Sequence, residues 1–138
     1  MTDIHAFTLE FEVRDYECDL QGIVNNAVYQ NYLEHARHVF LKTQGLDFAA
    51  LSQAGVNLVV VRIELDYLVS LRSGDRFTVS VDLERVSRLR FGILQTIYRL
   101  TDGRPALRAR VIATAITAAG RPIMPSEIEQ LLPSQAPG

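Results

Sequence analysis

The hydrophobic residues of this chain repeat with two different periods, and one long segment alone has the helical one. Over residues 26–43 the apolar side chains recur every three to four positions, which predicts an amphipathic helix. Gly45 supplies a stop signal just past its end. The expected buried face consists of Val28, Tyr32, Leu33, Ala36, Val39 and Phe40.

Most other apolar segments alternate with polar residues at every second position, which is typical of half-buried strands. In the first strand Phe7, Leu9, Phe11 and Val13 share a face. A second strand follows Gly55, with Val59, Val61, Ile63, Leu65 and Tyr67 expected on one face. Three further strands are predicted near residues 77–84, 89–100 and 106–118, the last two joined by the hairpin signal TDGRP.

One long helix followed by consecutive strands favours the α+β class, because parallel crossovers would require strands and helices to alternate. The four strands after the helix are expected to pair as an antiparallel meander. A short helix is predicted at residues 47–54, and another, capped by Ser126, is followed by a loose tail. The length of 138 residues predicts one domain.

Composition restricts the kind of partner. A net charge of −2 with 48% hydrophobic residues disfavours a nucleic-acid-binding protein. Cys18 is the single cysteine, which excludes an internal disulfide and multi-cysteine metal motifs and is consistent with a reducing compartment. The chain has no recognisable targeting segment and no apolar run of membrane-spanning length, so a cytoplasmic location is expected.

The segment before the long helix carries groups suited to acyl chemistry. Gly22 permits close backbone approach, and the first helix amides, near Asn25 to Val28, lack intrahelical acceptors. Asp19 could act as nucleophile or general base on an acyl group whose carbonyl oxygen rests on those amides. The alternative is structural: an Asp-x-x-Gly turn, with Asn25 or Asn26 as an N-cap.

Other polar residues near this segment have simpler interpretations. Asp15, Glu17 and Asp19 occupy alternate positions, so an extended chain would place all three carboxylates on one side. His35 and His38 lie one helical turn apart without a further ligand cluster and are expected to face solvent. Cys18 is expected to be a small packed side chain.

The run VRDYECDLQGIVNNAVYQNYLEHARHVFL resembles the signature of the 4-hydroxybenzoyl-CoA thioesterase family. Its RDYE, VNNAVY and RH elements are similar to the plant acyl-lipid thioesterases, which cleave acyl-ACP. The resemblance covers about residues 7–120 and implies a single hotdog domain over residues 1–138. Its fold would be a long central helix wrapped by a five-stranded antiparallel sheet.

The resemblance also assigns roles residue by residue. Asp19 matches the catalytic carboxylate, and the backbone amide of Asn26 matches the donor that polarises the thioester carbonyl. Glu34 matches the acidic residue inside the helix, although it could simply pair with Arg37 or His38. The expected substrate-binding residues are Gly22, Asn25, Tyr29, Tyr32, Glu34, Val59, Val61, Arg88 and Arg90.

Several arginines could bind the part of the substrate that carries the acyl group, either CoA or ACP. Lys42 is the single lysine among 14 basic residues, so 13 are arginines. Arg88 matches a position that contacts CoA phosphates in the family, and with Arg85 and Arg90 it could instead meet the acidic surface of ACP. The alternative is that these arginines only keep an exposed strand end soluble.

Together these features predict an acyl thioesterase of fatty acid metabolism that needs neither metal nor redox cofactor. A hydroxyacyl-thioester dehydratase and a non-catalytic module that binds acyl chains or acyl-carrier protein remain alternatives. The long, β-prone second strand predicts a homodimer or homotetramer joined edge to edge. In the family the acyl site lies at the dimer interface, so residues near Val59 to Arg62 of one chain would face Asp19 of the other.

Overall fold

The computed structural model describes residues 5–133. The segment with the helical period forms one long helix, α1 (Asn26–Thr43). The side chain of Asn25 accepts a hydrogen bond from the amide of Ala27 at 3.0 Å and so caps the first turn. After the last turn Gly45 has a φ of +87°, a conformation that favours glycine. Both predicted ends of this helix are confirmed.

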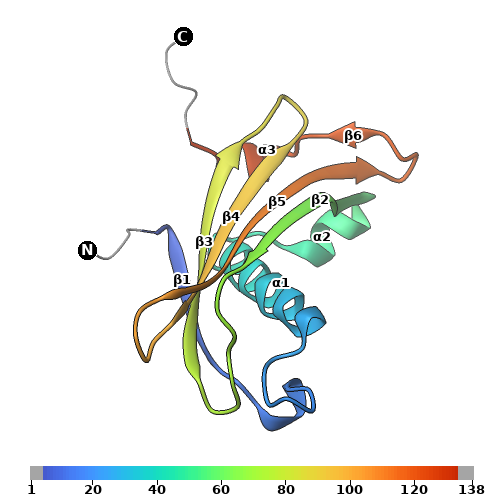
Figure 1. Cartoon of the computed structure of the whole chain (residues 1–138). Helices are drawn as coiled ribbons and strands as arrows, with labels where there is room; N and C mark the ends of the chain where they lie inside the picture. The colour runs from blue at the N-terminus through green and yellow to red at the C-terminus, as the bar shows by residue number, and fades with distance from the viewer. Residues whose placement is uncertain (1–4, 134–138) are drawn as a thin grey trace.

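The strands form one antiparallel sheet that curves around α1 (Figure 1). They are β1 (Phe7–Glu12), β2 (Val56–Tyr67), β3 (Arg76–Arg85), β4 (Phe91–Arg99), β5 (Pro105–Thr117) and β6 (Pro122–Ile123). Their order is β1-β3-β4-β5-β2, with the two-residue β6 paired to the end of β5. The predicted α+β class is confirmed, although the sheet has six strands rather than five.

The predicted four-strand meander is wrong at its first strand, since β2 pairs with β5 and not with β3. Residues 68–75, which connect β2 to β3, do not make a tight hairpin. The amide of Leu68 donates to the carbonyl of Ala106, and that of Leu71 donates to the Tyr29 hydroxyl. The chain therefore passes the N-terminal end of α1. It then crosses to the opposite edge of the sheet, where β3 pairs with β1. Strands β1 and β2 become the two edges.

A β-bulge interrupts the predicted alternation along β2. Val60 pairs with Ala113 and Arg62 with Ile112, so Val61 is the extra residue. The register places Leu58 and Val60 on the helix-facing side with Ile63, in place of Val59 and Val61. One inserted residue exchanges the faces of everything before it.

The core lies between α1 and the concave face of the sheet. Phe77 is fully buried, stacks on Phe11 with ring centroids 5.2 Å apart, and lies 4.8 Å from Tyr32. The buried residues of α1 are Tyr29, Tyr32, Leu33, Ala36, Arg37, Phe40 and Leu41. Val28 and Val39 of the predicted face are half-buried.

Three short helices complete the described chain: η1 (Asp15–Glu17), α2 (Phe48–Gln53) and α3 (Ser126–Glu129). Ser126 is the first residue of α3 rather than its cap; Pro125 holds the cap position and provides no side-chain hydrogen bond. The predicted loose tail, residues 134–138, lies outside the described residues. No helix within residues 5–133 is long and apolar enough to cross a membrane.

Candidate active site

Residues 17–25 form a small hairpin directly before α1. The amide of Asn25 donates to the carbonyl of Glu17 at 3.0 Å, and that of Asp19 donates to the carbonyl of Ile23 at 2.9 Å. An antiparallel bridge joins Cys18 to Val24 between them. Gly22 completes the tip with a φ of +80°, where other residues would be strained. The hairpin holds Asp19 close to the start of the helix.

The Asp19 side chain is exposed and is partly used by its own turn. Its Oδ1 atom accepts hydrogen bonds from the amide of Gln21 at 2.8 Å and that of Ile23 at 3.4 Å. No hydrogen bond to Oδ2 is found among residues 5–133. The carboxylate is thus oriented by one oxygen while the other stays available to a substrate.

The N-terminus of α1 supplies donors beside this hairpin. The amide of Ala27 is taken by the Asn25 side chain, but in the described part of the chain the amide of Asn26 has no acceptor. Together with the positive end of the helix dipole, this N–H suits a developing oxyanion. The predicted roles divide clearly, with Asn25 as the N-cap and Asn26 as the candidate donor.

Two tyrosines of α1 anchor the loops that flank the site. The Tyr32 hydroxyl donates to Oε1 of Glu17 at 2.8 Å, and the Tyr29 hydroxyl accepts from the amide of Leu71 at 3.1 Å. Burial, together with the hydrogen bond to the Glu17 carboxylate, raises the pKa of Tyr32 well above its ordinary value. Both tyrosines, which were predicted to bind substrate, use their hydroxyl groups to tie flanking loops to α1.

Replacing Tyr32 with Phe removes the hydroxyl that ties the hairpin to α1. A hydrogen bond to a carboxylate is worth ~1.5–3 kcal/mol, and Glu17 is partly solvated, so we expect a loss of about 1–2 kcal/mol in the free energy of unfolding. Urea denaturation measures this loss. Tyr16→Phe is the matched control, because Tyr16 is 76% exposed and bonds only Arg14 among the described residues. Equal losses in the two variants would contradict the anchoring role.

Two pockets lie between α1 and the chain segment that contains β2 and the residues following it. A pocket of about 120 Å³ adjoins the start of α1 and is lined by Ile23, Val24, Asn26, Tyr29, Tyr67, Leu68, Val69 and Ser70. A second, of about 240 Å³, lies farther along the helix and includes Glu34 and Val59 among its lining residues. Of the predicted substrate-binding and catalytic residues, Asn26 and Tyr29 thus line the smaller of these two pockets, and Glu34 and Val59 line the other. Val61 is 43% exposed at the bulge.

Glu34 does not form the helix-surface pair that its spacing permits. No ion pair links it to Arg37 or His38 among the described residues, and Arg37 turns inward, only 9% exposed. The His38 ring instead lies 5.3 Å from the ring of Phe48. Glu34 is left exposed at the rim of the larger pocket.

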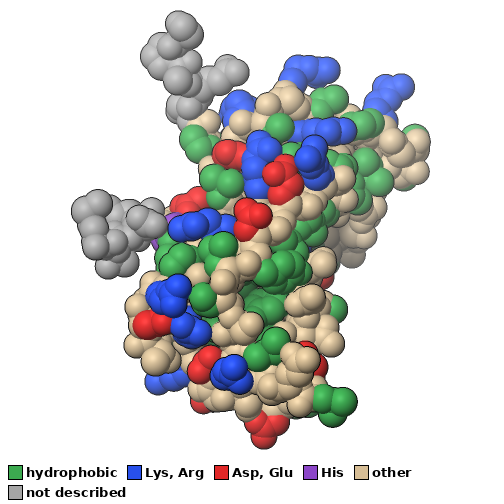
Figure 2. Space-filling model, in the orientation of Figure 1, with side chains coloured by type: hydrophobic (Ala, Val, Ile, Leu, Met, Phe, Trp, Pro, Cys, Tyr) green, Lys and Arg blue, Asp and Glu red, His purple; other side chains and the backbone are tan. Residues whose placement is uncertain are grey.

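The structure does not bring Arg88 and Arg90 near Asp19 of the same chain. Both are exposed in the turn between β3 and β4, whereas the hairpin contacts the loop that precedes β3. The ten residues of β3 separate the two ends by about 30 Å at ~3.3 Å per residue. Figure 2 shows Lys and Arg side chains gathered near the β3–β4 end, with acidic ones among them. Arg85 is already paired with Glu129 at 2.6 Å.

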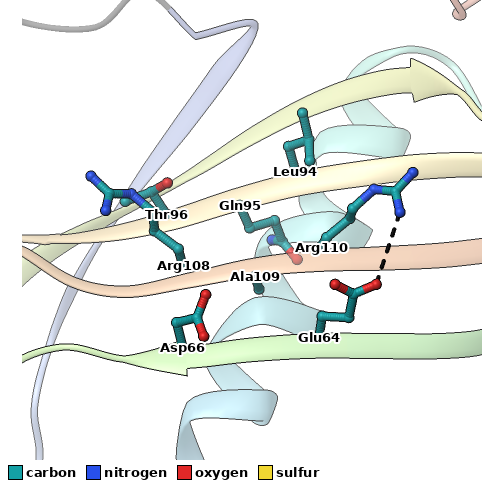
Figure 3. A pocket seen from close by; sticks show the side chains of 8 residues that line it. All are labelled: Glu64, Asp66, Leu94, Gln95, Thr96, Arg108, Ala109 and Arg110. Atoms are coloured by element: carbon teal, nitrogen blue, oxygen red, sulfur yellow. Dashed lines mark ion pairs between the residues drawn. The ribbon is translucent and has the colours of Figure 1, made fainter.

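A different, shallow pocket lies on the sheet face that points away from α1 (Figure 3). Here Glu64 of β2 reaches toward Arg110 of β5, and Arg110 also pairs with Glu84 at 2.7 Å. Arg110 thus pairs with Glu64 on the neighbouring strand and, across β4, with Glu84 of β3. These side chains lie on the face opposite α1, away from the Asn26 amide at the start of that helix.

Three secondary expectations can be compared with the structure. The carboxylates of Asp15, Glu17 and Asp19 do not line one side, because residues 15–17 are helical, and Asp15 bonds Ser73 while Glu17 bonds Tyr32. His35 and His38 are exposed, and Cys18 is half-buried against the core, as expected. Within residues 5–133 no group of three or more His, Cys, Asp or Glu side chains is arranged to hold a metal ion.

Periodicity alone does not identify the polar pair inside the core. Arg37 of α1 donates to Gln95 of β4 at 3.1 Å, and both are buried. Periodicity does indicate that each side chain points inward, because Gln95 lies between Ile93 and Ile97 and Arg37 lies four residues from both Leu33 and Leu41, but it does not indicate that the two meet. Glu17, the partner of Tyr32, carries no comparable signal.

The chain is similar in sequence to known thioesterases. Residues 13–132 match the family described as the thioesterase-like superfamily. The chain is 37% identical over 129 residues to the acyl-acyl carrier protein thioesterase ATL3 of Arabidopsis thaliana, covering 93% of this chain and 67% of the relative. It is also 37% identical over 121 residues to ATL2 of the same plant, covering 87% and 64%. The chain thus spans about two thirds of the length of these relatives, both of which are called chloroplastic.

Solved structures support the fold. A 1,4-dihydroxy-2-naphthoyl-CoA thioesterase from Synechocystis superposes with a TM-score of 0.85 at 20% identity, covering 91% of this chain and 94% of that one. This likeness confirms the hotdog fold that the sequence motif implies. The resemblance to plant acyl-ACP thioesterases is likewise confirmed by the two Arabidopsis relatives.

Proposed function

The chain belongs to the thioesterase-like superfamily, and from this membership we propose that it hydrolyses an acyl thioester of CoA or acyl-carrier protein to a free carboxylic acid and a thiol. The observation that carries the proposal is the placement of Asp19. Its carboxylate is held in an exposed turn directly before α1, where the amide of Asn26 lacks an acceptor among the described residues. These are the two groups that acyl transfer requires.

The reaction can proceed in two ways from this arrangement. In one, an Asp19 oxygen attacks the thioester carbonyl, the carbon–sulfur bond breaks, and water hydrolyses the mixed anhydride. In the other, Asp19 takes a proton from a water molecule that attacks the carbonyl directly; the carbon–sulfur bond then breaks, and the leaving thiolate takes up a proton. In both, the Asn26 amide stabilises the oxyanion, a contribution typically worth ~3 kcal/mol. Neither route uses a metal or redox cofactor.

A dehydratase would need a histidine near the helix start, and the positions of the described histidines disfavour one. His5 bonds Asp82 at 2.6 Å and Tyr98 at 3.0 Å, and Asp82 projects from the sheet face opposite α1. His35 and His38 lie well along the helix, against Phe11 and Phe48. The hydrolase is therefore the better proposal.

The carrier is tested by comparing acyl-CoA and acyl-ACP substrates of equal chain length for thiol release. The two plant relatives are named for acyl-carrier protein, and a structural neighbour from Staphylococcus aureus, 20% identical, was solved in complex with CoA. Faster release from one series identifies the carrier. No release from either, with the protein folded, would contradict the proposed activity.

Arg88 and Arg90 are proposed to hold the phosphates or acidic surface of the carrier. Replacing each with Ala should raise KM several-fold and leave kcat nearly unchanged, because the contacts lie far from the reacting carbonyl. The effect should shrink at high salt, since both side chains are exposed. Arg104→Ala, in the exposed β4–β5 turn, is the control. A salt-insensitive fall in kcat would place the two arginines elsewhere in the mechanism.

We further propose that two chains pair through their β2 edges, so that Arg88 and Arg90 of one chain could serve Asp19 of the other. The edge exposes Val60 by 45% and Val61 by 43%. Light scattering at micromolar concentration should show a dimer or larger assembly, and Val61→Lys should shift it toward monomer. Leu100→Lys, equally exposed but in a turn, should not. A fully active wild-type monomer would contradict the shared site.

A further inference from the structure

The pocket between the middle of α1 and β2 combines an apolar lining with a buried cation. Its volume is about 240 Å³, and its mouth carries Glu34 and His38. Its apolar residues come from both layers of the fold and comprise Leu41, Phe48, Leu58, Val59, Val60, Phe91, Ile93 and Ala113. The pocket differs from an ordinary alkyl site because Arg37 also lines it.

Arg37 is held in one orientation by a buried amide. Its Nη1 atom donates to Oε1 of Gln95 at 3.1 Å, and Nε2 of Gln95 donates to the carbonyl of Leu33 at 3.1 Å. Gln95 is 2% exposed and Arg37 is 9% exposed. The guanidinium is therefore positioned by the protein before any ligand arrives.

The charge of Arg37 is not matched by an ionic partner. Within residues 5–133 no carboxylate lies within 4.0 Å of its guanidinium nitrogens, although Glu34 one turn away acts on it through space. Burial lowers the pKa of Arg37 from its ordinary value. A guanidinium carries five N–H donors, and Gln95 uses one of them. Among residues 5–133, Nε of Arg85 is the one buried side-chain nitrogen or oxygen without a hydrogen-bond partner. The remaining donors of Arg37 therefore open onto the pocket, where a ligand can supply an acceptor.

We propose that Arg37, held by Gln95, is a specificity-determining residue that binds an oxygen atom at the far end of the acyl group. This inference rests on the proposed thioester hydrolysis. The hydrogen bond to Gln95, which itself bonds Leu33, places the guanidinium near the level of Leu33. Leu33 is seven residues beyond Asn26, about 10 Å along the helix at ~1.5 Å per residue. The substrate is thus a medium-length acyl group that ends in a hydroxyl, oxo or carboxylate oxygen.

A purely structural role for Arg37, tying α1 to β4, makes a different prediction. If Arg37 only connected α1 to β4, its replacement would lower the free energy of unfolding and leave the preference among acyl groups unchanged. A recognition residue changes the preference among substrates, and its replacement by an apolar side chain of similar length is often tolerated by the fold. Substrate preference and folding stability must therefore be measured on the same variants.

The test compares wild type with Arg37→Met, using Arg104→Met as an exposed control. The substrates are acyl-CoAs of equal medium chain length that end in a methyl, a hydroxyl or a carboxylate group. Wild type and control should prefer the oxygenated chains by at least ~10-fold in kcat/KM, with the carboxylate preferred most, because hydrogen bonds to a charged group are strong. Arg37→Met should lose that preference and remain folded. If Arg37→Met does not fold, Arg37→Gln removes the charge while keeping a partner for Gln95.

Calorimetry separates this inference from the proposed activity. Binding of the same intact thioesters is measured on the Asp19→Asn background, with and without the Arg37 replacement. If wild type releases no thiol from any thioester, the proposed hydrolysis fails, while the binding preference still decides the role of Arg37. Equal binding of plain and oxygenated chains, absence of binding, or a preference that survives the loss of Arg37 would each overturn the inference.

Discussion

Replacing Asp19 with Asn is expected to lower turnover at least ~100-fold while leaving the fold intact. The amide oxygen of Asn can still accept the hydrogen bonds from Gln21 and Ile23, so the turn is preserved. The substitution removes the negative charge, and with it both the nucleophile and the general base. Thiol release measures turnover, and circular dichroism with urea denaturation measures the fold.

Cys18→Ser is the matched control for Asp19→Asn, because Cys18 is the adjacent residue of the same hairpin. The proposed chemistry needs no thiolate, so this variant should retain most of the activity. Near-normal hydrolysis by Asp19→Asn would contradict the assignment. An equally large loss in Cys18→Ser, without unfolding, would move the catalytic role to the thiol.

The second large effect is structural and concerns Phe77. This side chain is fully buried and packs against both Phe11 of β1 and Tyr32 of α1. Phe77→Ala should cost about 3–5 kcal/mol in the free energy of unfolding, since the rigid aromatic neighbours cannot fill the cavity completely. A loss of that size is a large part of the stability of a typical domain. Urea denaturation followed by circular dichroism gives the value.

Leu94→Ala provides the comparison for Phe77→Ala. Leu94 is 38% exposed on the sheet face away from α1, and its truncation should change stability by no more than about 0.5 kcal/mol. If Phe77→Ala cost no more than Leu94→Ala, the contact between β3, β1 and α1 would not be the centre of the core.

Local features of the fold were predictable because they depend on nearby residues. The helical period, the cap at Asn25 and the stop at Gly45 define α1 correctly. Alternation places Phe7, Leu9 and Phe11 on the core side of β1. Such patterns record which face is buried, and burial of one face is what sets the period.

The partner of β2 was not predictable from periodicity, which shows that a strand has one buried face but not its neighbours. Contacts of residues 68–75 with Tyr29 and Ala106 carry the chain away from a simple hairpin. The bulge at Val61 is also invisible, because a run of valines reads the same in either register. Both features depend on residues distant in the sequence.

The candidate site likewise contains residues that are close in sequence, which were predictable, and residues that are distant in sequence, which were not. Asp19, Gly22, Asn25 and Asn26 are contiguous in sequence, and the structure brings them together in one hairpin and helix start. Arg37 and Gln95 are 58 residues apart and meet only through packing of α1 on β4. Arg88 and Arg90 lie at the other end of β3 from the hairpin, so only in the proposed dimer would they serve Asp19, that of the second chain.

The most direct test of the central claim follows one acyl thioester through the reaction and measures both products together with the amount of enzyme. Thioester hydrolysis predicts equal amounts of thiol and free carboxylic acid over many turnovers, with the rate lowered at least ~100-fold in Asp19→Asn. Tight binding of the thioester by the folded protein without thiol release, or conversion of a hydroxyacyl thioester to an unsaturated thioester with the carbon–sulfur bond intact, would contradict it.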